Sequence, residues 1–366
     1  MLMIAATLPS ILFAPWIGKI VDSVHPSTLI PLIVSITALL VGSLRLLYKP
    51  WQLAVVIAAI GLAAAVTTTA LVSILPKLAD RFSWSATRIN AIYEVVRSGS
   101  YMLAPPIAAI SVTRMGYHVT TTVTAVLYVC SGLIFIVLLR WLIPQVKAQR
   151  RRSFKVERKQ PLYSGFRTLF SKPKIRTTMV VVSIAVAASA VFDVLLIFFI
   201  ELELNLGINH YGTLLAMWSV GLILGPILTR FTSEDESIRI TTRQALLWSL
   251  VHIVGFGLPA LLPYPWLAYM SFLIGGAGNA LQNTYLRVTV LTAFPNSQTR
   301  GSTLAAYLAV LQAGSVCGLF IAGLIPADYA RLGMVLAAGF SITITIITLY
   351  GLKYFSFRDR STHEAD

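Results

Sequence analysis

Long stretches of uncharged, mostly apolar residues fill this chain, and the charged residues gather in short segments between them. Most of these stretches reach the length of about 20 residues that an α-helix needs to cross the hydrocarbon core of a bilayer. Turn-forming residues separate neighbouring stretches, for example at Lys49-Pro50 and at Pro263-Tyr264-Pro265. The pattern predicts eleven membrane-spanning helices, at residues 2–17, 28–48, 53–76, 85–112, 119–143, 177–203, 211–230, 243–262, 266–293, 302–325 and 332–352.

The composition excludes a water-soluble globular protein. Hydrophobic residues make up 57% of the chain, charged residues only 12%, and the mean hydropathy is +0.78. Tryptophans stand at the ends of the apolar stretches, where an aromatic belt at the membrane surface would place them, at Trp16, Trp51, Trp141 and Trp266. The fold class that follows is an all-α polytopic membrane protein.

The chain is strongly basic, with 29 Lys and Arg against 14 Asp and Glu and a net charge of +15. Many of these basic residues lie between the fifth and sixth predicted helices, and the positive-inside rule places that segment in the cytoplasm. Contact with anionic membrane lipids is expected there. No nucleic-acid partner is expected, because no recognition motif accompanies the charges. The cluster consists of Lys147, Arg150, Arg151, Arg152, Lys155, Arg158, Lys159, Arg167, Lys172, Lys174 and Arg176.

A weak internal repeat divides the predicted helices into two bundles. Ala14-Pro15 in the first helix has a counterpart in Gly225-Pro226 of the seventh, and Thr87-Arg88 in the fourth has one in Thr299-Arg300 of the tenth. Parallel repeats of this kind are typical of large secondary transporters. We therefore expect an N-terminal bundle of five helices at 1–143, a basic cytoplasmic linker at 144–175, a C-terminal bundle of six helices at 176–354 and a cytoplasmic tail at 355–366.

Few residues suggest covalent, metal or nucleotide chemistry. Cys130 and Cys317 both lie inside predicted helices, where a thiol usually packs as a small apolar group. The five histidines are scattered along the chain, and the phosphate-binding motif GxxxxGK[ST] is absent from the sequence. We expect no cofactor, no metal site and no enzymatic activity. A membrane-embedded lipid enzyme, the less favoured alternative, would need clustered acids or histidines near one membrane surface.

Ionisable side chains inside the predicted helices are few, and each costs at least about 2.5 kcal/mol at mid-bilayer, so each is a candidate functional residue. Glu94 and Arg97 lie three residues apart, close enough on a helix to neutralise each other, either as a structural ion pair or in transport. Asp193 lies well inside the sixth helix without an obvious local partner. Asp193 is the first candidate proton carrier and Glu94 the second. A hydrogen bond between helices is the alternative role for Asp193.

A polar stripe follows the ninth predicted helix. Asn279, Gln282, Asn283 and Arg287 fall at helical spacing there. The stripe is a candidate lining of a substrate path, in which Arg287 would attract an anionic group. Arg97 is a further candidate substrate-binding residue. Hydrogen bonding between helices is the alternative, because Asn and Gln side chains often serve that purpose in membranes.

Three motifs resemble the major facilitator superfamily and, within it, the drug and siderophore exporters related to macrolide efflux pumps. Gly18-Lys19-Ile20-Val21-Asp22 resembles the start of the signature loop between the second and third helices of that family. Asn90-Ala91 follows Pro76 as in that group, and Ala104-Pro105-Pro106-Ile107-Ala108-Ala109 is similar to the antiporter motif Gly-Pro-x-x-Gly-Gly. Ser23, His25, Pro26 and Ser27 depart from the signature loop, which usually has Arg, Gly and two basic residues there.

The resemblance implies a secondary active transporter in the plasma (inner) membrane that exports a small drug- or siderophore-like molecule in exchange for protons. It implies gating roles for Gly18 and Asp22 in the signature loop and for Pro105 in the antiporter motif. The family has twelve helices, so this sequence looks like a variant lacking the first one. An inactive or scaffold-type membrane protein derived from such a transporter is the alternative.

Overall fold

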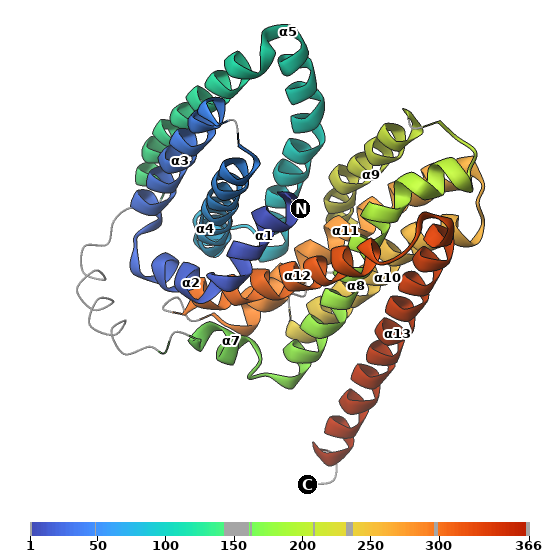
Figure 1. Ribbon diagram of the computed structural model, residues 1–366. Helices are drawn as coiled ribbons and strands as arrows, with labels where there is room; N and C mark the ends of the chain where they lie inside the picture. The colour runs from blue at the N-terminus through green and yellow to red at the C-terminus, as the bar shows by residue number, and fades with distance from the viewer. Residues whose placement is uncertain are drawn as a thin grey trace. The chain divides into compact units, whose positions relative to one another are not determined.

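The computed structural model describes residues 2–47, 49–142, 161, 163–207, 209–231, 237–295 and 299–363. The regular elements within these ranges are helices (Figure 1). Residues 143–160, the main part of the predicted basic linker, lie outside the described ranges. The longer helices are α1 (Leu2–Leu12), α2 (Ala14–Ser23), α3 (Pro26–Ser43), α4 (Pro50–Phe82), α5 (Ala86–Leu142), α8 (Pro173–Leu202), α9 (Asn209–Ile227), α10 (Ile238–Leu261), α11 (Pro265–Ala293), α12 (Arg300–Gly323) and α13 (Ala330–His363). Short helices between them are η1 (Leu44–Leu46), α7 (Ser164–Leu169), η2 (Leu228–Phe231) and η3 (Ala327–Tyr329).

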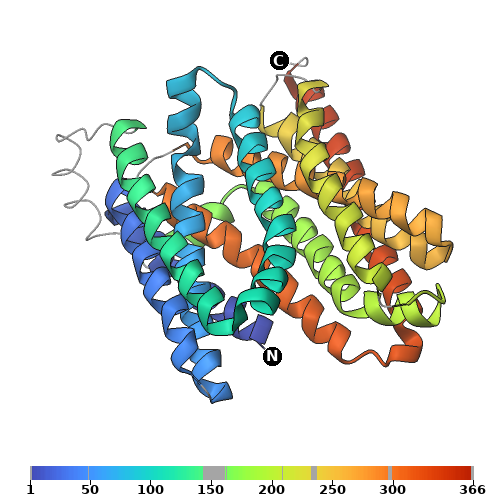
Figure 2. The same ribbon diagram turned by 90° about the horizontal axis from the view of Figure 1, so that it is seen from above.

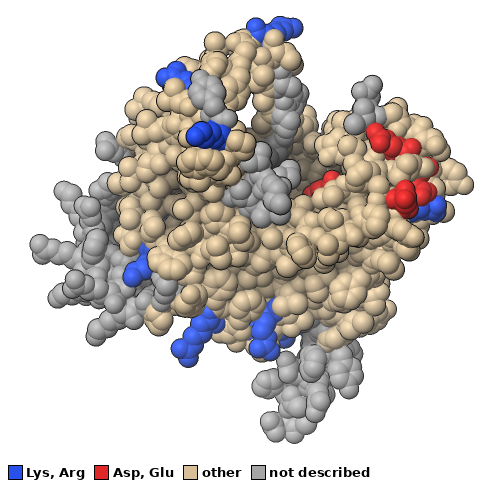
Figure 3. Space-filling model, viewed as in Figure 1, with Lys and Arg blue, Asp and Glu red and all other residues tan. Residues whose placement is uncertain are grey.

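The outer surface of these helices suits a membrane. Eight helical segments of the described chain are long and apolar enough to cross a bilayer. Most of the described surface visible in Figure 3 is formed by uncharged residues, and large apolar side chains such as Leu39 (76% exposed) and Val137 (68% exposed) point outward. The prediction of an all-α polytopic membrane protein is therefore confirmed. Helix α11 is not among the eight segments, and its polar stripe lowers its mean hydropathy.

The first predicted helix, at 2–17, is two helices in the structure. Helix α1 ends at Leu12, and α2 begins at Ala14 and continues to Ser23. Pro15 stands in the first turn of α2, where its missing N–H group costs nothing. The same missing donor means that Pro15 cannot bond back to the preceding turn, which permits the break at Phe13.

Helix α5 covers two of the predicted spans. Its helical assignment runs from Ala86 to Leu142, but Gly116 has φ 76° and ψ 164°, which separates the helix into two arms. A side chain would be strained at this φ, so glycine is the residue that permits the turn. The second arm lies alongside α3 (Figures 1 and 2), where the Tyr117 hydroxyl donates to the Leu44 carbonyl over 3.3 Å and Arg45 Nη1 donates to Thr122 Oγ1 over 3.3 Å.

The chain forms two compact units, each made from separate parts of the sequence. Unit 1 contains Met1–Ile89, Leu103–Ser171 and Phe294–Gln312, and unit 2 contains Asn90–Met102, Lys172–Ala293 and Ala313–Asp366. Helices α5 and α12 therefore each contribute to both units. The bundle boundaries expected from the internal repeat stay a prediction.

The core of unit 2 contains an aromatic cluster that brings α8, α9, α10 and α11 together. Phe256 stacks on Phe192 with ring centroids 4.8 Å apart and on Trp218 at 4.5 Å, and it meets Phe272 edge-on at 5.2 Å. Such aromatic pairs each contribute about 0.5–1.5 kcal/mol beyond their burial. The cluster fixes the neighbouring turns of α10 and α11, which carry the polar residues described below.

Helix α11 touches two other helices through glycine. A Cβ added at Gly255 of α10 would lie 2.4 Å from the Gly275 Cα, and one added at Gly221 of α9 would lie 2.0 Å from the Leu273 carbonyl oxygen. Neither position has room for a side chain. This close approach is the usual way in which small residues pack transmembrane helices.

The core of unit 1 is aliphatic. Ile17 of α2, Ile30 of α3 and Ile74 of α4 are buried together, and Ala305 from the first part of α12 packs against them. Helices α1 and α4 also approach closely, since a Cβ at Gly61 would lie 1.9 Å from the Ala6 carbonyl oxygen. This core places the end of α2, with its predicted gating residues, beside the start of α12.

Candidate functional site

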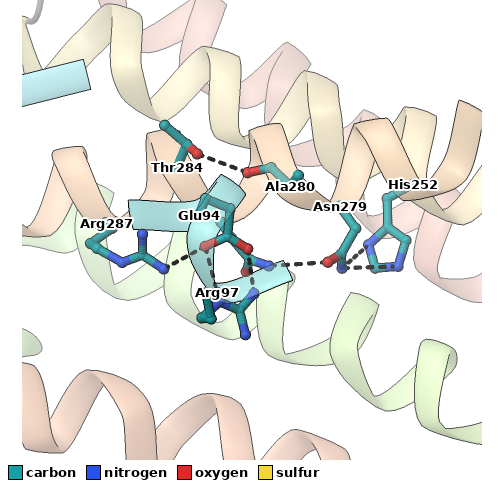
Figure 4. A network of polar contacts seen from close by, with 8 residues as sticks. Glu94, Arg97, His252, Asn279, Ala280, Thr284 and Arg287 are labelled. Carbon is teal, nitrogen blue, oxygen red and sulfur yellow. Dashed lines mark hydrogen bonds and ion pairs between the residues drawn. The ribbon is translucent and has the colours of Figure 1, made fainter. Parts of the chain in front are cut away.

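A cluster of three charged residues lies within unit 2, between the Asn90–Met102 part of α5 and helix α11. The Glu94 side chain is fully buried and accepts hydrogen bonds from both nearby arginines (Figure 4). Arg97 donates from Nε over 3.2 Å and also from Nη2, while Arg287 donates from Nη2 over 3.0 Å. The predicted Glu94–Arg97 contact is therefore present, and the structure adds Arg287 to it.

The arginines outnumber the carboxylate in this cluster. The Arg287 side chain is only 7% exposed and the Arg97 side chain 32%. Arg287 lies over the Tyr93 ring, 4.7 Å from its centroid, which orients the guanidinium group. Its Nη1 atom is buried and has no hydrogen-bond partner among the described residues. The three side chains thus carry a formal charge of +1, and one Arg287 donor is unused among the described residues, in a largely buried place where polar groups need partners.

A second polar network, also within unit 2, surrounds His252 of α10. The imidazole is fully buried, with Nδ1 2.9 Å from Gln282 Oε1 and Nε2 2.7 Å from the Ser189 hydroxyl. Asn279 Nδ2 lies 3.3 Å from both ring nitrogens, and Asn283 Nδ2 donates to Asn279 Oδ1 over 3.1 Å (Figure 4). An amide oxygen only accepts, so Nδ1 carries the proton and Nε2 accepts from Ser189.

Sequence reasoning missed His252. The five histidines are scattered along the sequence, yet His252 lies in the middle of a predicted membrane-spanning helix, at 243–262. That position was the available signal, because an ionisable group at mid-bilayer is a functional candidate by default. The structure shows that His252 links the predicted stripe on α11 to α8 through Ser189.

The stripe on α11 has two faces. Gln282 is fully buried and bonds to His252. Asn279, Asn283 and Arg287 follow one another at intervals of four residues, and Asn279 and Asn283 are each partly exposed. The second face therefore leads from the His252 network toward the arginine cluster.

Asp193 stands apart from both networks. It lies in α8, one turn beyond Ser189, and its side chain is exposed although the surrounding turns are buried. Its carboxylate has no hydrogen bond or ion pair among the described residues, and Tyr211 of α9 lies within electrostatic range. A charged group in the middle of an apolar helix does not face lipid without a large cost, so we expect Asp193 to face water or polar groups of the protein.

The predicted gating residues lie in unit 1. The Asp22 carboxylate accepts from the backbone N–H groups of Gly301 over 2.6 Å and Ser302 over 2.8 Å, and from the Ser302 hydroxyl. Asp22 thus caps the first turn of α12, where an acidic group is favoured by the helix dipole. A Cβ at Gly18 would lie 2.4 Å from the Ser302 Cα. Pro105, the third predicted residue, lies in α5, and its side chain is outside the described set.

Burial raises the pKa of the Asp22 carboxyl from 3.8 to about 6, although the hydrogen bonds from Ser302 and Gly301 act in the opposite direction. The raised value means that the folded protein binds this proton more tightly than an exposed carboxyl does. The resulting contribution to stability is present below pH 4 and is lost as the pH rises through 6. It amounts to a difference on the order of 2 to 3 kcal/mol.

We expect Asp22→Asn to become more stable relative to the wild type as the pH rises from 4.5 to 7.5, because the amide has no charge to desolvate. Thermal unfolding of the two purified proteins across this range measures the effect. Asp328→Asn, at an exposed acid in η3, is the matched control and should show no such trend. A stability difference between Asp22→Asn and the wild type that stays constant with pH would contradict the assignment.

The long apolar helices, with charged and amide groups held among them, define an integral multi-pass membrane protein. The chain belongs to the major facilitator superfamily, whose sequence model matches residues 1–299. No curated protein sequence matches the chain. Family membership makes it a secondary transporter of a small molecule, not an enzyme, as expected from the sequence.

A solved structure is similar over nearly the whole chain. It is a crystal structure of a bacterial homologue of the iron transporter ferroportin in an outward-facing state with soaked iron. The TM-score is 0.66 at 12% sequence identity, and the match covers 95% of this chain and 89% of that chain. At this identity the likeness establishes a shared fold.

Proposed function

We propose that the protein exports a small drug- or siderophore-like molecule across the inner membrane by proton-coupled alternating access. The observation that carries the coupling is Asp193, a carboxylate in the middle of an apolar helix that has no ion pair within the described parts of the chain. Such a group can take up a proton on one side of the membrane and release it on the other. Glu94 is the second candidate, although two ion pairs already stabilise its charged form.

The proposed substrate surface is formed by Arg97, Asn279, Asn283 and Arg287. Gln282 supports this surface from its buried side through the hydrogen bond to His252. Arg97, Asn279 and Asn283 are partly exposed, so a ligand can reach them. Gly18, Asp22 and Pro105 are the proposed gating residues, because Asp22 and Gly18 hold the first turn of α12. Release of that contact would free the N-terminal end of α12 to move.

Reconstitution into proteoliposomes tests the proposed function. A pH-sensitive dye enclosed in the vesicles reports proton movement while a panel of drug-like and siderophore-like compounds is added. We expect at least one compound to move protons in the wild type, with uptake or release that reverses when the imposed pH gradient is reversed. Transport of a compound that does not depend on the imposed pH gradient would contradict proton coupling. Absence of any movement across the panel would favour the inactive or scaffold-type alternative.

A further inference from the structure

We infer that the substrate carries one anionic group, a carboxylate or a similar oxyanion, that binds to Arg287 and Arg97 beside Glu94. This inference rests on the proposed substrate surface and specifies its chemistry. It depends on three observations within unit 2: the charge balance of the cluster, the unused donor of Arg287, and the amides that continue along the same face of α11.

The charge balance selects a single negative charge. The two arginines and Glu94 together carry a formal charge of +1, and both Glu94 and Arg287 are almost completely removed from water. A buried surplus charge is unfavourable until a counter-charge joins it. A monoanion brings the cluster to neutrality, whereas a neutral or cationic ligand leaves the surplus in place or increases it.

The geometry of Arg287 allows the anion to bind without displacing Glu94. Its Nη2 atom already donates to Glu94 over 3.0 Å, and Tyr93 covers one face of the guanidinium plane. Its Nη1 atom is buried and has no partner among the described residues. Planar guanidinium groups bind oxyanions through such N–H edges, so Nη1 is the expected donor to the ligand.

The surroundings fit an organic molecule better than a bare inorganic ion. Arg97, at 32% exposure, lies at the accessible side of the cluster. Asn283 and Asn279 lie one and two turns before Arg287 on α11 and are partly exposed. Their amide groups can hydrogen-bond to the polar body of a ligand whose charged end is held by the arginines.

The test measures binding to the purified full-length chain by isothermal titration calorimetry and thermal shift. The probes are sodium acetate, benzoate, 1-naphthoate and benzenesulfonate, each compared with its uncharged amide. We expect at least one anion to bind at least tenfold more tightly than its amide, because a charge-assisted hydrogen bond is lost in the amide. Sodium chloride alone is the inorganic comparison and should compete only weakly.

Arg287→Gln should weaken the binding of that anion at least tenfold, and it leaves Glu94 paired with Arg97, so the charge of the cluster becomes balanced. Arg97→Gln is the second variant, for use if Arg287→Gln does not yield folded protein. Arg331→Gln is the matched control, because Arg331 pairs with Glu203 elsewhere in unit 2 at 3.1 Å and its side chain is 40% exposed. Its anion affinity should equal that of the wild type.

Three results would overturn the inference: amides that bind as tightly as their anions, chloride that binds as tightly as the best organic anion, or unchanged anion affinity in the arginine variants. These results are separate from the fate of the proposed function. Gradient-driven transport of an uncharged or cationic compound, with no anion binding, would contradict the anionic substrate group but not the proposed transport function. Anion binding without gradient-driven transport would remove only the proton coupling.

Discussion

Replacing Asp193 by Asn should abolish transport driven by a pH gradient while leaving substrate binding and protein yield largely unchanged. Asparagine keeps the size and most of the hydrogen-bonding capacity of aspartate but cannot change its charge. The substitution therefore removes a proton-binding group without opening a cavity. Because the Asp193 side chain is exposed and lacks an ion pair among the described residues, no buried partner is left without its counterpart.

The alternative role for Asp193 predicts a different outcome. If the carboxylate serves only to hold a neighbouring helix, asparagine can replace it at a cost of about 1 kcal/mol and transport should persist. Substrate flux against an imposed pH gradient in proteoliposomes distinguishes the two. Val180→Ala, at an exposed apolar position of α8, is the control for disturbance of the helix. Gradient-dependent flux in Asp193→Asn equal to that of the wild type would remove Asp193 from the coupling mechanism.

Replacing Glu94 by Gln should lower both the yield of folded protein and the flux. The substitution leaves Arg97 and Arg287 without the carboxylate that both contact. Removing one partner of a buried ion pair typically costs about 3–5 kcal/mol, because the remaining charge stays buried and uncompensated. Here two guanidinium groups are affected, so we expect a large loss of thermal stability, measured by unfolding of the detergent-purified protein and by its size-exclusion profile.

A double variant shows whether the loss of stability in Glu94→Gln comes from unbalanced charge or from altered packing of the side chain. Glu94→Gln combined with Arg287→Gln restores the single surplus charge of the wild type and should recover a substantial part of the lost stability. Glu203→Gln, which breaks a more exposed pair with Arg331, should cost no more than about 1 kcal/mol. If Glu94→Gln is as stable as the wild type, the ion pairs contribute little to folding.

The helices could be predicted from the sequence because a membrane-spanning helix can be recognised from its length and composition alone. Each of the eleven predicted stretches is mainly helical in the described residues, and eight helical segments there are long and apolar enough to cross a bilayer. The break at Phe13 was missed because a proline near a helix end is compatible with one bent helix or with two. Helix α7 was missed because its six residues are too short to carry an apolar period.

The candidate site was only partly accessible to sequence reasoning. The Glu94–Arg97 contact follows from a spacing of three residues on one helix. The contacts of Glu94 with Arg287 and of Asp22 with Ser302 connect residues that are 193 and 280 positions apart. No local pattern encodes which helices become neighbours, so these contacts required the structure. His252 was missed although its place inside a predicted membrane-spanning helix marks it as a candidate, because the five histidines form no cluster along the sequence.

The glycine contacts of α11 have a consequence for how unit 2 can respond to a ligand. At Gly255 and Gly221 the backbones of neighbouring helices meet directly, so these two contacts have no side chain that could absorb a displacement. Sliding α11 past α9 or α10 would drive carbonyl oxygens and Cα atoms into each other, so the three helices behave mechanically as one piece. The rigid group of helices α9, α10 and α11 then carries Asn279, Asn283 and Arg287. The fit of a ligand is adjusted by rotation of these side chains rather than by movement of the helices.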